Sequence, residues 1–172
     1  TRILVDCGLF QGGRELRNLN WTPPPPELQG ADTILLTHAH LDHSGAIPRL
    51  VRNGWKGRVI ATRATAELCE LLLPDSGHLQ EKDAQFDNRR GYSRHRPALP
   101  LFQGVSFEEI VEVAPGISAR FHRVGHILGA ASIEIDWKGT RILFSGDLGR
   151  YGDAVMYDPA FPAAADYLIV ES

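Results

Sequence analysis

The feature that most constrains this chain is the run Thr37-His38-Ala39-His40-Leu41-Asp42-His43, which holds three of the seven histidines within six residues. No folding requirement explains that density, because histidine is a poor helix former and buried polar groups must be paired. A metal site explains it directly, since neutral imidazole is the commonest metal ligand and a carboxylate adds charge. The alternative interpretation is a set of surface histidines on a polar loop.

The segments on either side place this run between a strand and a helix. Residues 33–37 are a short apolar run of the buried-strand type, and residues 44–51 look like the start of a helix. The run therefore lies at the carboxyl end of a strand, where open α/β sheets place their sites. In an extended chain His38 and His40 point to the same side, whereas Asp42 and His43 can reach a second point nearby. This arrangement predicts two metal ions.

The remaining elements alternate, which predicts an α/β fold. Strands are expected at 2–6, 33–37, 58–61, 117–124, 131–137, 141–145 and 166–171, the turn Lys138-Gly139 joining two of them as a hairpin. A helix is expected from Thr62 or Thr65 through Leu73, ended by Pro74, and residues 76–92 are polar and weakly helical. Because both ends of the chain fall inside expected strands, we expect residues 1–172 to be an incomplete domain truncated at both ends.

Composition limits the partners and the compartment. The 172 residues suffice for one core, and no apolar run is long enough to span a membrane, so we expect a cytoplasmic protein. A net charge of −3 gives no global attraction to nucleic acid, so such a partner must be recognised locally. The two cysteines form no disulfide framework, and Cys7, beside Asp6, is only a minor candidate ligand.

Two further short motifs stand at expected strand ends. Gly125-His126 follows the strand 117–124, and Ser145-Gly146-Asp147 closes the strand 141–145. Each puts a metal-capable side chain beside a glycine, which lets the backbone approach closely. Either motif alone would more often be a satisfied polar turn. Together with the histidine run they predict one compact site.

With these motifs the chain resembles the metallo-β-lactamase superfamily. The matching residues are Asp6 in Leu-Val-Asp-Cys-Gly, the cluster from His38 to His43, His126 and Asp147, in that order. Within the superfamily it is most similar to the β-CASP ribonucleases, which include prokaryotic RNA-processing nucleases and the endonuclease of eukaryotic pre-mRNA 3′-end cleavage. The sequence segments that indicate this branch are residues 7–12, 75–81, 125–130, 145–149 and the terminal Glu171-Ser172.

The resemblance implies a partial αββα sandwich with two zinc ions. It assigns the first zinc to His38, His40, His126 and Asp147, and the second to Asp42, His43 and the shared Asp147. Asp6 would support the cluster and the attacking water, and Glu171 would be an acidic residue where the β-CASP insert begins. That insert, with its histidine that assists the leaving group, and the final histidine of the second zinc are absent from these residues.

The expected reaction is RNA cleavage by a water that two metal ions activate. RNA comes from the resemblance, because the same ligands would serve lactams, thioesters or phosphodiesters. A local signal is residues 88–96, in which four arginines surround a tyrosine; the alternative there is a solvated basic face. Two other functions stay open: another hydrolase of this fold acting on thioesters or esters, and a non-catalytic scaffold subunit. A homo-oligomer is also possible.

Overall fold

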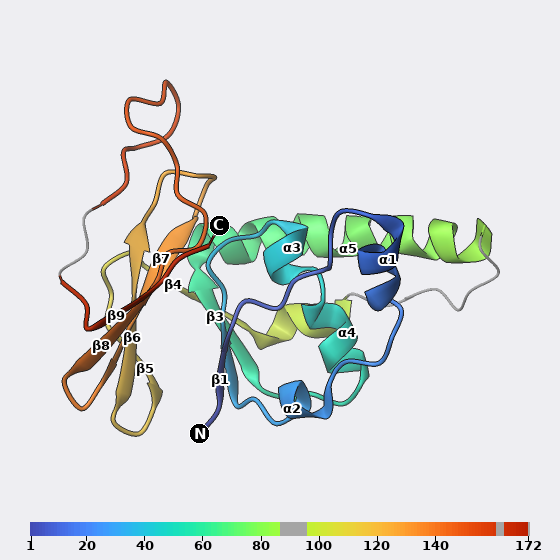
Figure 1. Ribbon diagram of the computed structural model, residues 1–172, viewed down its shortest axis with the longest axis horizontal. Coiled ribbons are helices and arrows are strands. Elements are labelled where there is room, and N and C mark those ends of the chain that lie inside the picture. Colours follow the sequence, from blue (N-terminus) through green and yellow to red (C-terminus); the bar gives the residue numbers. More distant parts are fainter. Residues whose placement is uncertain (87–95, 161–163, 172) are drawn as a thin grey trace.

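The computed structural model describes residues 1–86, 96–160 and 164–171, and these form two sheets with helices on one side (Figure 1). The first sheet contains β1 (Ile3–Val5), β2 (Thr33–Leu35), β3 (Arg58–Thr62) and β4 (Phe102–Val105), in that order and all parallel. The second contains β5 (Val111–Ala114), β6 (Ile117–Arg123), β7 (Ala131–Trp137), β8 (Thr140–Phe144) and β9 (Tyr167–Ile169). Its strands are antiparallel except for the parallel pair β8 and β9.

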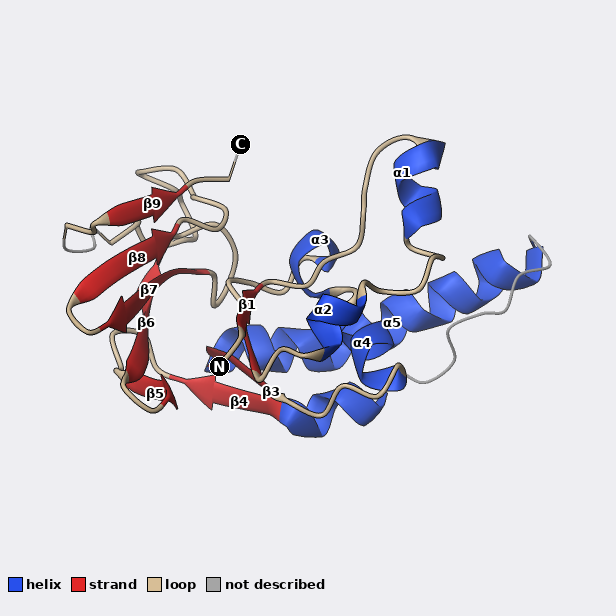
Figure 2. Cartoon of the chain, turned by 60° about the horizontal axis from the view of Figure 1, so that its bottom comes forward, coloured by secondary structure: helices blue, strands red, loops and turns tan. Residues whose placement is uncertain are grey.

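The helices lie on the face of the first sheet that is turned away from the second sheet (Figures 1 and 2). They are α1 (Arg14–Leu19), α2 (Pro26–Gln29), α3 (Leu41–Ser44), α4 (Ile47–Arg52), α5 (Arg63–Phe86) and the 3-10 helix η1 (Arg96–Leu101). Among the described residues, no helix covers the outer face of the second sheet (Figure 2). The predicted α/β class is confirmed, with helix, sheet and sheet stacked as three layers.

Strand alternation sorts the core into two layers. On β2 and β3, Ile34 and Val59 face the helices, where they pack with residues such as Leu50 and Leu73. Their neighbours Leu35 and Ile60 face the second sheet. Because successive side chains of a strand point to opposite faces, an unbroken apolar run is what a sheet buried on both sides requires. This double burial fixes the register of β2 and hence the place of the motif that follows it.

The long helix α5 corrects one prediction. We expected a helix that ends at Pro74, but α5 continues to Phe86 with Pro74 inside it. Proline removes one backbone hydrogen bond and costs about 3 kcal/mol in a helix interior. Buried positions continue past the proline, however, because Ser76 and Gly77 are covered as Leu73 is before it. Burial of one continuous helix face therefore outweighs the local signal.

Other boundaries shift by less. The strands expected at 117–124, 131–137 and 141–145 are present as β6, β7 and β8, and the hairpin turn at Lys138-Gly139 has positive φ at both residues. The expected helix start at Ser44 is wrong, because α3 ends there and α4 begins at Ile47. Strands β4 and β5 were not predicted. Most of the arginine-rich segment 88–96 lies outside the described residues.

Candidate metal centre

The histidine run lies at the carboxyl end of β2, clamped by the segment that follows β1. The N–H of Cys7 donates to the carbonyl of His43 (2.6 Å), and the N–H of Leu9 donates to the carbonyl of Leu41 (2.8 Å). Between them, Gly8 lies against the backbone of Asp42 so closely that a Cβ atom on Gly8 would be 1.4 Å from the Asp42 oxygen. The glycine of the Asp-Cys-Gly motif is thus required sterically at this position.

Four side chains from three segments converge on one point. His38, His40, His126 and Asp147 each offer a ligand atom, and these atoms all lie within 4.8 Å of one another. Nε2 of His38 is 2.9 Å from Nδ1 of His40, and Nε2 of His126 is 3.2 Å from the same Nδ1. Nε2 of His126 is also 3.2 Å from Oδ2 of Asp147. Three imidazoles that direct nitrogens at one another and at a carboxylate form a donor set suited to a cation.

His38 is held in the form that binds metal. Its side chain is fully buried, and the pKa is lowered from 6.5 to about 3, first by burial and then by His43, His40 and His126. A metal ligand must be the neutral imidazole. Because burial keeps His38 neutral at physiological pH, no proton has to be removed from it before a metal binds.

Asp6 supports the cluster from beneath. Its Oδ1 accepts the backbone N–H of Thr37 (2.7 Å), and its Oδ2 accepts the Thr37 hydroxyl (2.8 Å) and lies 2.8 Å from Nδ1 of His43. The carboxylate therefore favours the His43 tautomer that carries hydrogen on Nδ1 and leaves Nε2 free. Asp6 itself has a φ of 59°, a left-handed conformation that aspartate tolerates better than most residues.

His43 directs this free nitrogen at a second group of carboxylates. Its Nε2 is 3.6 Å from Oδ1 of Asp147 and 3.7 Å from Oε1 of Glu171. Burial lowers the His43 pKa, but the hydrogen bond and charge of Asp6, with the charges of Glu171 and Asp147, raise it overall. Asp147 thus faces the first cluster with one oxygen and His43 with the other. Asp6, His43 and Glu171 also form a second group of possible ligand atoms within 4.8 Å of one another.

Asp42 differs from the other predicted ligands. Its residue is exposed, and among the described residues it belongs to neither group of converging ligand atoms. It does line the open cleft of about 490 Å³ at this edge, together with His43, His126, Asp147, Glu171 and residues 145–146, 148 and 170. The structure therefore brings Asp42 to the site, although its side chain does not join the cluster.

Glycines let the two other strand ends approach the histidine run. Gly125 has a φ of 66° and Gly146 a φ of 52°, conformations that glycine adopts without a steric cost. A Cβ atom on Gly146 would lie 3.0 Å from Cβ of Thr37. Thr37 is the functional residue that the sequence patterns do not reveal, because its two hydrogen bonds to Asp6 join residues 31 positions apart.

Cys7 shows no sign of metal ligation. It is buried, and burial, with the charge of Asp6, raises its pKa to about 12. The thiolate, which is the form that binds metal, is therefore disfavoured at neutral pH. Among the described residues, Cys7 is in neither group of converging ligand atoms.

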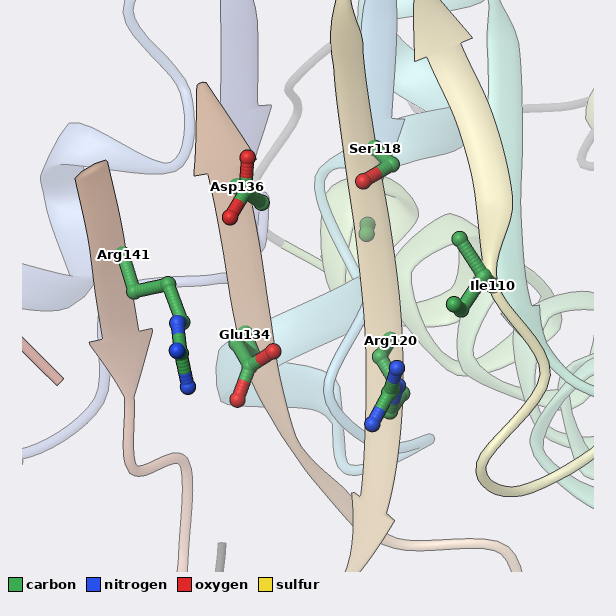
Figure 3. A pocket seen from close by; sticks show the side chains of 7 residues that line it. Ile110, Ser118, Arg120, Glu134, Asp136 and Arg141 are labelled. Atoms are coloured by element: carbon green, nitrogen blue, oxygen red, sulfur yellow. The ribbon is translucent and has the colours of Figure 1, made fainter. Parts of the chain in front are cut away.

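A second hollow, of about 300 Å³, lies on the outer face of the second sheet (Figure 3). Figure 3 shows Arg120 on β6, Glu134 and Asp136 on β7, and Arg141 on β8 along this face. Carboxylates and guanidinium groups alternate here, so the hollow offers no concentrated charge to a metal ion. The metal-binding chemistry of the described residues is therefore at the carboxyl edge of the sheets.

Comparison with known proteins places this geometry in a family. The family described as the metallo-beta-lactamase superfamily matches residues 1–169. The zinc-bound PqqB of Methylobacterium extorquens, a solved structure, is similar over 98% of this chain and 55% of that chain, with a TM-score of 0.53 and 16% identity. At that identity the likeness concerns the fold alone.

Three curated relatives are similar in sequence. Ribonuclease TTHA0252 of Thermus thermophilus is 38% identical over 99% of this chain and 38% of its own length. Transcription termination factor FttA of Methanosarcina mazei is 32% identical over 93% of this chain and 25% of its own. Cleavage and polyadenylation specificity factor subunit 3-I of Arabidopsis thaliana is 32% identical over 99% and 24%. The chain thus spans about a quarter to two fifths of these relatives.

None of the helices in the described parts of the chain combines the length and the apolarity that crossing a membrane requires.

Proposed function

The chain belongs to the metallo-β-lactamase superfamily, in the β-CASP branch that its motifs resemble, and from this premise we propose that it carries the two-zinc site of a ribonuclease. The observation that carries the proposal is the convergence of His38, His40, His126 and Asp147 within 4.8 Å. RNA as substrate is supported by the relatives, among them a ribonuclease and a cleavage and polyadenylation factor.

The residues take distinct parts in this proposal. His38, His40, His126 and Asp147 would hold one zinc ion, and His43 and Asp42, with the other oxygen of Asp147, would hold the second. When bound, the ions would make a water molecule nucleophilic near neutral pH and stabilise negative charge on a phosphate oxygen.

Asp6 and Glu171 would act on this site without holding the first ion. Asp6 keeps Nδ1 of His43 protonated and so leaves Nε2 free for the second ion. Glu171, half-exposed and 3.7 Å from His43 Nε2, lies in the wall of the cleft where substrate would enter. From there its carboxylate would orient a water or accept its proton. The reaction would take place on cytoplasmic RNA.

The test combines metal removal with one matched pair of variants in the full-length protein. Chelation should abolish cleavage of a single-stranded oligoribonucleotide, and zinc should restore it. Asp147→Asn should lower the cleavage rate by at least about 100-fold, because it removes a charged ligand shared by both positions. Asp136→Asn, on the outer face of β7, is the control and should leave the rate unchanged.

The same assay separates the competing functions. A thioester substrate should be left intact. Cleavage of the thioester but not of RNA would assign the site to another hydrolase of this fold. Binding of RNA without zinc-dependent cleavage of either substrate would point to a scaffold subunit and contradict the proposal.

A further inference from the structure

The loop Leu148–Ala160 begins directly after Asp147 and rises above the end of the second sheet, in orange-red at the top of Figure 1. Its two ends are fixed to the end of β6. The N–H of Gly149 donates to the carbonyl of Val124 (2.8 Å), and the N–H of Ala160 donates to the carbonyl of Arg123 (2.8 Å). The loop is therefore rooted beside His126, and its first residue, Leu148, lines the metal cleft.

Carboxylates hold the loop in one shape. Oδ1 of Asp153 accepts the N–H groups of Val155 and Met156 (2.9 and 3.1 Å), and its Oδ2 accepts Nε–H of Arg150 (2.9 Å). Asp158 accepts the N–H of Gly152 (2.7 Å). These hydrogen bonds within the loop stabilise it in place of the inter-strand hydrogen bonds of a sheet. A loop fixed in this way can present side chains at defined positions beside the cleft.

Tyr157 is the side chain that this loop presents, and its ring lies against an arginine side chain. Its ring centroid lies 5.0 Å from Cζ of Arg123, and the same guanidinium carbon lies 5.7 Å from the ring centroid of Phe107. Phe107 packs on the core between the sheets, so the contacts run from the core through Arg123 to Tyr157. Tyr157 is nevertheless 75% exposed. The ring is supported on one side by a cation and is open to solvent elsewhere.

The backbone of Tyr157 also touches the metal centre's own segment. A Cβ atom on Gly125 would lie 2.3 Å from the Tyr157 carbonyl oxygen, so the two backbones are in direct contact. Gly125 immediately precedes His126. The backbone of Tyr157 therefore lies against the segment that carries His126 into the cleft, which Leu148 of the same loop also lines.

Resting on the proposed function, we propose that Tyr157 is a stacking platform for an unpaired nucleobase of the RNA strand whose phosphate lies at the metal centre. Aromatic side chains bind single-stranded RNA in this manner, and stacking tolerates every base because each has a π-face. The arginine beneath the ring adds positive charge, which suits a polyanion. An apolar protein segment would gain nothing from that charge.

The experiment measures binding of RNA with and without the base. The full-length protein carries Asp147→Asn to slow cleavage, and its affinity for a fluorescent oligoribonucleotide is compared with that for oligomers with single abasic sites along the strand. Tyr157→Ala should weaken binding of the intact strand by about 5- to 150-fold, the range for one stacked base. Tyr157→Phe should retain affinity. The control Tyr167→Ala removes another exposed tyrosine ring, from β9, and should leave the affinity unchanged.

An abasic site at one position should remove the effect of Tyr157→Ala, because no base is left there to stack. Equal affinity of Tyr157→Ala and the parent for the intact strand would overturn the inference. So would a loss of the same size at every abasic position, which would indicate general damage to the loop. In the protein without Asp147→Asn, absence of zinc-dependent RNA cleavage would instead refute the proposed function.

Discussion

Replacing Asp6 by asparagine should weaken metal binding at the position that His43 serves. The carboxylate accepts three hydrogen bonds, two from Thr37 and one from Nδ1 of His43. An asparagine amide has the same shape, but one of its oxygens becomes an N–H₂ donor. In one orientation this donor faces His43 Nδ1, and in the other it faces the backbone N–H of Thr37. Either orientation sets one donor against another.

The size of the effect follows from that conflict. To bind zinc through Nε2, His43 must keep its hydrogen on Nδ1, and leaving that buried donor unsatisfied costs about 1–3 kcal/mol. This converts to a loss of about 5- to 150-fold in affinity. It agrees with the 10- to 100-fold that is typical when the partner of a ligating histidine is removed. The first position, held by His38, His40, His126 and Asp147, should change less.

Two measurements on the same protein test this reasoning. Zinc titration against a chromophoric chelator should show one site weakened and the other retained in Asp6→Asn. Nitrogen-15 NMR of the histidine rings should show hydrogen on Nε2 of His43 and a lower pKa, because burial then acts without the Asp6 charge. Asp32→Asn is the control, since Asp32 binds the N–H of Arg2 away from the site. Unchanged affinity with an unchanged tautomer would refute the argument.

Three further predictions concern the metal-free protein. Burial raises the pKa values of Cys7 and Cys69 to about 12, so both thiols should resist alkylation at pH 8 until the protein unfolds; rapid labelling of the native protein would contradict this. The pKa of His38 is lowered to about 3, so below pH 6.5 the unfolded chain takes up a proton that the folded chain does not. The free energy of unfolding should therefore decrease as the pH is lowered, by up to about 1.4 kcal/mol per pH unit. His43, whose pKa is raised, contributes in the opposite sense, so urea titrations of His38→Gln should show a smaller loss between pH 6.5 and pH 4 than the parent. Gly8→Ala should lower the free energy of unfolding by at least about 1–3 kcal/mol, because the new Cβ would overlap the Asp42 carbonyl; an unchanged urea midpoint would show that the clamp yields.

The positions of the chemical residues could be predicted because strand ends are readable from sequence. Residues 33–37 are apolar and bounded by the motif, and Gly125-His126 and Gly146-Asp147 end runs of alternating or apolar residues. Strands β6 and β8 both run antiparallel to β7, so their carboxyl ends share one edge of the second sheet, and the ligands that follow them meet those that follow β2 of the first sheet. Strand pairing and the stacking of the two sheets bring these strand ends together in the folded chain.

The features that could not be predicted depend on contacts between distant segments. Pro74 ends a helix by local rules, but α5 continues past it with Ser76 and Gly77 buried, and burial of this kind depends on tertiary packing. The support of His43 by Asp6 needs residues 37 positions apart, and the arginine contact of Tyr157 joins a strand to a loop. Strands β4 and β5 contain exposed residues (Gln103, Gly104 and Glu112) and pair with β3 and β6, so no unbroken apolar run marks them in the sequence.

The most direct test of the metal centre is anomalous diffraction at the zinc edge from crystals of the protein grown with zinc. One peak should lie about 2.0–2.2 Å from a nitrogen of each of His38, His40 and His126 and from an oxygen of Asp147, the usual zinc–ligand distances. A second peak should lie beside Nε2 of His43, about 3.5–4 Å from the first, as in two-metal hydrolases. Ordered zinc elsewhere with no peak among these side chains would contradict the account.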